Sequence, residues 1–189
     1  KIYKNSSEKL VPVTLELGGK SPMIVCEDVD VDKVIEGALT SMRFTRQGQS
    51  CTAASRIFVH ESVFDSFLEG LKAKLNELKI GDPMDMETDV GSVISPAQHQ
   101  KILTYVDIGK KTPGATAHEC SALPTDPKFS KGLFVRPVLF TGIPNSHQVS
   151  QEEIFGPVTV LIPWKDFDDV INQANDSDYG LAATLWTND

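Results

Sequence analysis

Short apolar runs alternate with amphipathic helical segments along the whole chain, and this alternation constrains the fold more than any other feature. Between Ser62 and Gly81, apolar residues recur at intervals of three and four, which indicates a helix with one buried face. Residues 22–26 and 56–60 are apolar runs too short for helices and are typical of buried strands. Strands that alternate with helices predict an α/β domain with a largely parallel sheet flanked by helices.

The same two patterns predict where each element lies. Asp28 and Asp30 are candidate N-caps for the helix that follows them, Ser62 is one for the next helix, and Ser95 with Pro96 supplies a cap and a first-turn proline for a third. Residues 112–130 are rich in Gly, Pro, Ser and Lys and are expected to form a loop in solvent. The expected strands cover residues 11–17, 22–26, 56–60, 133–140, 157–163 and 181–186, and the expected helices cover residues 31–43, 63–80, 96–106 and 167–175.

The composition narrows the classes of partner. The chain of 189 residues has a formal net charge of −8 and carries no basic stripe, so neither nucleic acid nor an anionic membrane surface is expected as a partner. No apolar run approaches the roughly 20 residues needed to span a bilayer. The length suits one domain with a substantial core.

The cysteines indicate a reducing compartment. There are three, Cys26, Cys51 and Cys120, and they are widely spaced, odd in number and without a Cys-x-x-Cys pair. This pattern argues against a disulfide framework and favours a cytoplasmic protein. The run His118-Glu119-Cys120 has no second ligand pair nearby, so no metal site is expected.

Cys51 lies in a run of small and polar residues between an expected helix and an expected strand. Residues 44–53 read Phe-Thr-Arg-Gln-Gly-Gln-Ser-Cys-Thr-Ala. Such neighbours leave a thiol accessible and allow backbone N–H groups to point at an oxyanion beside it, as a nucleophilic cysteine requires. A cysteine that only fills space at a turn is equally compatible with this stretch alone, because most free cysteines are small buried hydrophobes.

Four short stretches, taken in their order, carry a resemblance to a known family. They are Leu15–Pro22 (LELGGKSP), Gly48–Cys51 (GQSC), Gly81–Pro83 (GDP) and Glu152–Val158 (EEIFGPV). In this order they resemble the aldehyde dehydrogenase superfamily, and the similarity extends across essentially the whole chain. The resemblance implies the α/β catalytic domain of that family.

The resemblance implies NAD-dependent oxidation of a small-molecule aldehyde to a carboxylic acid, with NADP as the other possible cofactor. Cys51 matches the family's nucleophile, which forms a thiohemiacetal and then, after hydride loss, a thioester. Glu16 matches the general base that activates the water molecule releasing the acid. Without the motif, Glu16 would be interpreted as a solvated charge at the end of a strand.

Three further positions match the family's cofactor site. Glu153 matches the residue that hydrogen-bonds the hydroxyls of the nicotinamide ribose, and a carboxylate is a natural acceptor for a diol. Phe155 matches an aromatic residue that packs against the cofactor, although packing in the core would explain it as well. The backbone of Leu17 resembles the position whose carbonyl holds the nicotinamide amide.

The resemblance also implies that residues 1–189 are the nucleophile-bearing domain, cut from a longer polypeptide at both ends and without its dinucleotide-binding domain. The isolated chain is therefore expected to lack dehydrogenase activity. Members of the family are usually dimers or tetramers, so the parent enzyme is expected to be a homodimer or homotetramer.

Two other classes of function stay open at this point. Cys51 could pair with a histidine, for example His60, in a thiol hydrolase, or Cys51 and Glu16 could support weak esterase activity. The chain could also be a non-catalytic interaction module. The sequence does not identify the aldehyde.

Overall fold

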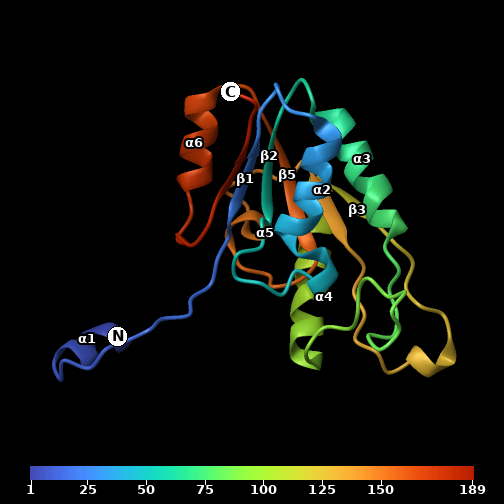
Figure 1. Cartoon of the computed structure of the whole chain (residues 1–189), viewed down its shortest axis with the longest axis horizontal. Coiled ribbons are helices and arrows are strands. Elements are labelled where there is room, and N and C mark those ends of the chain that lie inside the picture. The colour runs from blue at the N-terminus through green and yellow to red at the C-terminus, as the bar shows by residue number, and fades with distance from the viewer.

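The computed structural model describes residues 1–189 and has three layers, with helices on both faces of one sheet (Figure 1). The six strands are ordered β3-β4-β5-β2-β1-β6, and every neighbouring pair is parallel except β3 with β4. This confirms the predicted α/β domain with a largely parallel sheet. The strands are β1 Pro22–Val25, β2 Arg56–His60, β3 Thr116–Glu119, β4 Val138–Thr141, β5 Val158–Trp164 and β6 Thr184–Trp186.

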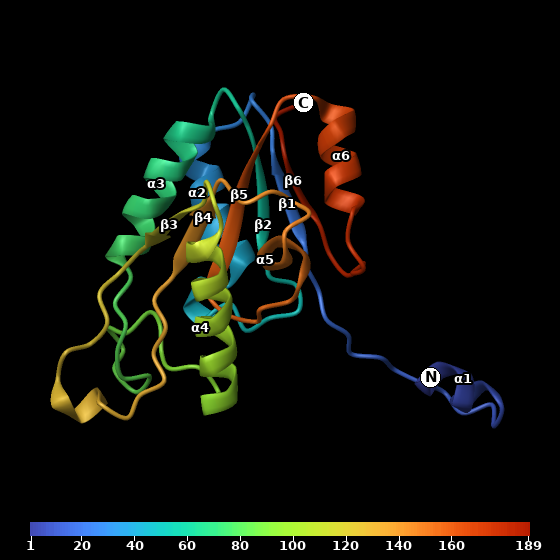
Figure 2. The ribbon, with the colours of Figure 1, turned by 180° about the vertical axis from the view of Figure 1, so that it is seen from behind.

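The helices divide between the two faces of the sheet. Figures 1 and 2, taken from opposite sides, show α2 and α3 in front of the strands in one view and α4 in front in the other. No helix is both long enough and apolar enough to cross a membrane. The α-helices are α1 Ile2–Ser7, α2 Val31–Met42, α3 Phe64–Glu77, α4 Pro96–Lys111, α5 Gln148–Gln151 and α6 Phe167–Asn175; two 3-10 turns are η1 Phe44–Arg46 and η2 Pro127–Phe129.

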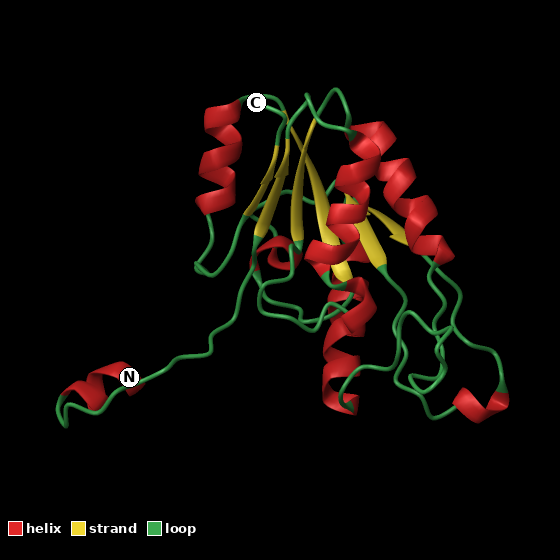
Figure 3. Cartoon of the chain, viewed as in Figure 1, coloured by secondary structure: helices red, strands yellow, loops and turns green.

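Alternation along the strands builds two hydrophobic layers, one on each face of the sheet shown in yellow in Figure 3. In β1, Met23 and Val25 join the cluster that includes buried residues of α2 and α3. Ile24, between them, joins the cluster that includes buried residues of α4, α5 and α6. The central strands are therefore buried on both faces, which explains their continuous apolar sequences.

The predicted helix starts are confirmed at two caps. The Asp30 carboxylate accepts a hydrogen bond from the Lys33 N–H at 3.4 Å. The Ser95 hydroxyl accepts one from the Gln98 N–H at 3.2 Å, with Pro96 in the first turn. The helix that starts at Pro96 continues to Lys111 instead of ending near residue 106, because its buried face extends to Gly109.

The expected strand at residues 11–17 is wrong. No strand of the sheet lies beside this segment, which runs outward and leads to α1 at the end of an extended arm (Figure 1). Three of its apolar side chains, Val11, Leu15 and Leu17, are exposed, with Leu17 64% exposed. Alternating apolar residues specify a strand only when a neighbour supplies hydrogen bonds and a surface to cover.

The expected loop at residues 112–130 is also wrong in part. Residues 116–119 form β3, an edge strand that pairs antiparallel with β4, and residues 127–129 form η2. The polar sequence Thr-Ala-His-Glu gives little sign of a strand because both of its faces are partly exposed.

Several element ends also differ from prediction. The helix expected over residues 63–80 ends at Glu77, and Ser62 does not cap it, since the Ser62 hydroxyl contacts His60 instead. Two expected strands shorten to β4 and β6, which start at Val138 and Thr184.

Arg56, at the start of β2, joins three parts of the fold and is 1% exposed. Its Nε donates to the Lys20 carbonyl at 3.0 Å, and its guanidinium donates to Asn145 Oδ1 at 3.0 Å and to the Ala174 carbonyl near the end of α6 at 2.8 Å. Burial lowers the pKa of Arg56 to about 10, although Asp176 opposes the shift. Arg56 thus connects the approach to β1 with the end of α6.

Replacing this residue, Arg56→Met, should lower the free energy of unfolding by about 3 kcal/mol, because buried carbonyl groups would lose their donors. Chemical denaturation measures the change. Arg46→Met is the matched control, since Arg46 is exposed, and should change stability by less than about 0.5 kcal/mol. Equal effects of the two substitutions would contradict this role for Arg56.

Candidate active site

Three of the four sequence motifs precede adjacent parallel strands. Gly18-Gly19 precedes β1, Cys51 precedes β2, and Glu153–Phe155 precede β5. In the sheet these strands lie in the order β5-β2-β1. Because parallel strands all begin at the same edge, the motifs come together at the amino edge of the sheet.

Two glycines allow the motif backbones to touch. A β-carbon on Gly19 would overlap the carbonyl oxygen of Cys51, and one on Gly48 would overlap the carbonyl oxygen of Gly156. Gly48 also has a φ of +63°, a conformation that glycine adopts without strain. The turn that carries Cys51 is therefore enclosed between the other two motifs by backbone contact.

Cys51 is the only one of the three cysteines that is not buried. It lies in a turn, and its backbone N–H donates to no acceptor in the chain. Burial raises the pKa of the Cys26 and Cys120 thiols above their usual value. Of the three thiols, Cys51 is thus the one with the access that a nucleophile requires, next to an unused N–H donor.

Glu16 and Leu17 lie on the exposed arm that enters the site at Gly18. The Glu16 carboxylate makes no hydrogen bond or ion pair, and the Leu17 carbonyl accepts no hydrogen bond within the chain. Glu16 is close in sequence to Gly19, whose backbone touches the Cys51 turn, but the fold does not hold its carboxylate against the thiol.

Glu153 contacts the glycine pair directly. Its Oε1 accepts a hydrogen bond from the Gly19 N–H at 2.8 Å. Its Oε2 has no donor in the chain and would stand 2.9 Å from a β-carbon on Gly18. One carboxylate oxygen is thus fixed and the other is free to accept.

Phe155, two residues on, is half-buried and has a φ of +59°. This left-handed conformation costs a bulky residue about 1 kcal/mol or more, so neighbouring groups must hold it. The Gln98 side-chain amide does so by donating to the carbonyls of Ile154 and Phe155, both at 2.8 Å.

One face of α4 braces the whole Glu152–Gly156 segment. Lys101 Nζ donates to the Glu153 carbonyl at 2.8 Å, Ile102 lies against Gly156, and the Tyr105 hydroxyl donates to the Glu152 carboxylate. Burial first, and then the bond to Glu152, raise the pKa of Tyr105 to about 12. Glu152 therefore makes a structural contact.

Sequence reasoning missed this brace. Gln98, Lys101, Ile102 and Tyr105 follow the i, i+3, i+4, i+7 spacing of one helix face, and that spacing was the available signal. Three of the four are polar or charged, so the face does not stand out as a hydrophobic stripe.

The Gly81–Pro83 motif supports the Cys51 turn from outside. The Gly81 N–H donates to the Val90 carbonyl at 3.1 Å, and Pro83 lies beside Gly91, which approaches the Gln47 side chain. From the same loop, the Ile94 N–H donates to Gln49 Oε1 at 3.0 Å.

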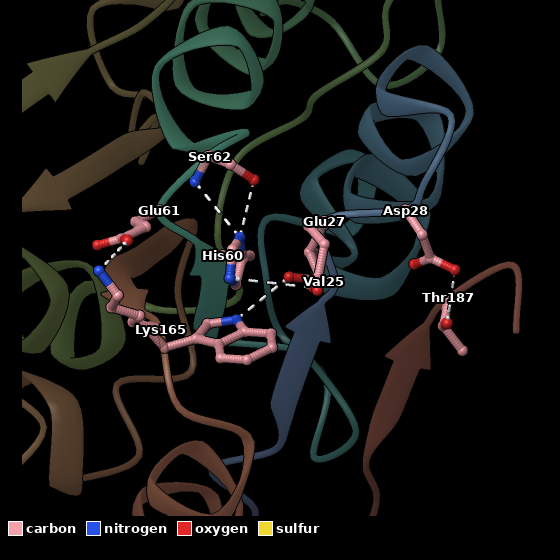
Figure 4. Close-up of polar contacts among 9 residues, drawn as sticks. Val25, Glu27, Asp28, His60, Glu61, Ser62, Lys165 and Thr187 are labelled. Atoms are coloured by element: carbon pink, nitrogen blue, oxygen red, sulfur yellow. Dashed lines mark hydrogen bonds and ion pairs between the residues drawn. The ribbon is translucent and has the colours of Figure 1, made fainter.

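His60 lies at the opposite end of β2 from Cys51 and does not form a pair with it. Figure 4 shows His60 among residues at the carboxyl edge of the sheet, with Nδ1 at 2.8 Å from the Ser62 hydroxyl and Nε2 at 4.0 Å from Glu27 Oε2. The His60 ring also packs edge-on against Trp164, whose Nε1 donates to the Val25 carbonyl at 3.2 Å. The Cys51–His60 hydrolase hypothesis therefore has no geometric basis in this fold.

Comparison with known proteins gives one consistent match. The model of the "Aldehyde dehydrogenase family" matches residues 1–189. The betaine aldehyde dehydrogenase of Mesorhizobium japonicum is 39% identical over 189 residues, which are 100% of this chain and 38% of that protein. The chain thus spans less than half the length of the relatives it matches.

Solved structures agree with the sequence match. The NAD+ complex of an aldehyde dehydrogenase from Bacillus cereus has a TM-score of 0.87 and 41% identity, covering 100% of this chain and 37% of that one. A betaine aldehyde dehydrogenase from Staphylococcus aureus in complex with NAD+ has a TM-score of 0.88 and 36% identity, covering 100% and 37%.

The Gly19 contact generates a testable prediction. Gly19→Ala should force the Gly18-Gly19 segment away from the Cys51 carbonyl, lower the free energy of unfolding by about 2 kcal/mol and change the rate of Cys51 alkylation. Gly180→Ala is the matched control, because Gly180 has open space around its α-carbon and no positive φ. Denaturation and mass-spectrometric alkylation rates test this. Wild-type behaviour of Gly19→Ala would disprove the contact.

Proposed function

The chain belongs to the aldehyde dehydrogenase family, and from that premise we propose that it is the nucleophile-bearing part of an enzyme that oxidises an aldehyde to a carboxylic acid with NAD+ or NADP+. The observation that carries this proposal is the meeting of Gly19, Cys51 and Glu153 at the amino edge of the sheet. Through Gly19, the turn that carries the accessible Cys51 thiol and the Glu153 carboxylate, which has one oxygen free, are held in the same site.

In the proposed reaction the Cys51 sulfur adds to the aldehyde carbon and forms a thiohemiacetal. The negative charge on the former carbonyl oxygen requires donors, and the unused backbone N–H of Cys51 is one. Loss of hydride from the carbon, for which a bound nicotinamide would be the acceptor, leaves a thioester. A thiolate suits both ends of this sequence, because it is a good nucleophile for the addition and a good leaving group when the thioester is hydrolysed. Water then releases the acid and returns the thiol.

Glu16 is the proposed general base for the water molecule. Its exposed position supports this role, as does the absence of hydrogen bonds from residues 12–17, since the carboxylate must approach for hydrolysis and leave room for the preceding step.

Glu153, Phe155 and the Leu17 carbonyl are the proposed contacts to the cofactor, whose nicotinamide, when bound, accepts the hydride. The chain's own geometry fits such a group. Glu153 Oε2 lacks a donor, the Leu17 carbonyl is unpaired, and a β-carbon on Gly18 would stand 2.9 Å from Oε2 and fill the approach to it. These are acceptors of the kind that ribose hydroxyls and a carboxamide need.

We further propose that residues 1–189 are one domain of the enzyme and that dinucleotide binding also requires a second domain. The support is the share of the relatives covered, 37–38% of their length. Weak ester hydrolysis through Cys51 and Glu16 is a compatible second activity, because an ester can acylate Cys51 with loss of its alcohol, and water then releases the acid from the thioester without any hydride transfer.

The test of the reaction is NADH formation by the full-length protein that carries these residues. The panel contains aliphatic, aromatic and acidic aldehydes and betaine aldehyde, which the name of the Mesorhizobium relative makes a reasonable member. Cys51→Ser should reduce the rate by at least about 1,000-fold, because removal of a nucleophile eliminates the covalent route. Cys120→Ala, a buried control, should retain activity. Full activity of Cys51→Ser would refute the proposed nucleophile.

The chain of 189 residues by itself should form no measurable NADH with any aldehyde in the panel. Absorbance at the NADH band measures this, with the full-length protein as the positive control. Robust turnover by the isolated chain would overturn the proposed need for a second domain.

A further inference from the structure

Lys20 is a buried lysine without a hydrogen-bond partner. It follows Gly19 directly, is 2% exposed, and its Nζ donates to no acceptor in the chain. A buried ammonium without acceptors is costly, so such a residue requires an explanation. The proposed reaction does not use it.

Four charged residues, from three parts of the fold, act on the charge of Lys20. Arg56 lies on β2, Lys101 on α4, and Glu152 and Glu153 on the segment before β5. Glu153 is the strongest of the two acidic influences, although it makes no direct ion pair with Lys20. Lys20 is also the direct neighbour in sequence of Gly19, whose N–H holds the Glu153 carboxylate.

The two other cations near Glu153 are already engaged. Arg56 donates to the carbonyls of Lys20 and Ala174, and Lys101 donates to the backbone carbonyl of Glu153. Neither is committed to the Glu153 carboxylate. Lys20 is the cation in this group whose hydrogen atoms are not used elsewhere.

We propose that Lys20 is a positioning residue of the site: its buried ammonium is the counter-charge that keeps the Glu153 carboxylate seated on the Gly18-Gly19 backbone, ready to accept the cofactor ribose. The role of Glu153 toward the ribose rests on the proposed function. The electrostatic coupling between Lys20 and Glu153 does not, because it needs only the residues of this chain. Protonation of Lys20 favours the seated carboxylate and deprotonation weakens it.

The charge on Lys20 is sensitive to pH near neutrality. Burial, followed by repulsion from Arg56, lowers the pKa of Lys20 to about 7, while Glu153 opposes the shift. The unfolded chain keeps its lysine protonated to about pH 10.4, so between about 7 and 10 it binds more protons than the folded chain. The free energy of unfolding therefore gains a contribution that rises with pH across this window.

The coupling is tested on the 189-residue chain by carbon-13 NMR of the lysine ε-carbons between pH 5 and 10. The Lys20 signal is the one missing in Lys20→Met. Glu153→Gln should lower its titration midpoint by about 0.5–1 unit, because the carboxylate favours the charged amine. Glu152→Gln is the matched control and should lower it by less. Equal midpoints in wild type and Glu153→Gln would overturn the proposal.

Chemical denaturation provides an independent measure. Lys20→Met should flatten the rise in unfolding free energy between about pH 7 and 10, and Lys33→Met, an exposed control, should leave it unchanged. The same slope in Lys20→Met and wild type would contradict a buried amine that titrates in this range.

The link to the cofactor is tested by NADH fluorescence titration of the full-length protein. Wild-type affinity should fall as pH rises from 6 to 9, and Lys20→Met should bind about five-fold more weakly at pH 6 and lose this pH dependence. NADH binding with identical pH dependence in both proteins would overturn the positioning role. Absence of NADH binding, with the NMR coupling intact, would refute the proposed function and leave the coupling standing.

Discussion

The site depends on backbone touching backbone. The α-carbon of Gly19 lies against the Cys51 carbonyl, and that of Gly48 lies against the Gly156 carbonyl, so three segments far apart in sequence share one small volume. Any larger side chain at these two positions would separate the thiol from the carboxylate of Glu153. The site can therefore form only because glycine, which has no β-carbon, occupies positions 19 and 48.

Contacts from the face of the sheet that α4 and α6 cover keep these segments in place. Helix α4 directs Gln98 and Lys101 at the carbonyls around Phe155, whose left-handed backbone needs that support. Arg56 donates to the Lys20 carbonyl and to the end of α6. Charged and amide side chains serve here as donors to backbone carbonyls, which suits buried segments that lack regular secondary structure.

The sequence predicts the features that depend on local signals and misses those that depend on tertiary neighbours. Caps at Asp30 and Ser95 and the stripe of α3 are local signals, and the structure confirms them. The arm at residues 11–17 and the strand β3 depend on whether a neighbouring strand exists, which no local pattern reports. Cys51 and Glu153 came from resemblance to a family, and their meeting follows once β5, β2 and β1 are known to be adjacent. The burial of Lys20 and the polar face of α4 are tertiary facts without a sequence pattern of their own.

The motifs lie just before paired strands, so the register of those strands determines how the motifs align with one another at the site. Pro22 is aligned with Arg56, and Arg56 with Val160. This alignment fixes the positions, along the strand direction, of the residues that precede each strand. Adjacent residues in a strand differ by about 3.3 Å, and a slip that keeps the same side chains buried must be two residues, or about 6.6 Å. Such a slip would preserve both hydrophobic layers yet carry the sulfur beyond the reach of the carboxylate. Hydrophobic packing alone therefore permits a two-residue change of register that would disrupt the site. The strand register is thus a requirement of the chemistry as well as of the core.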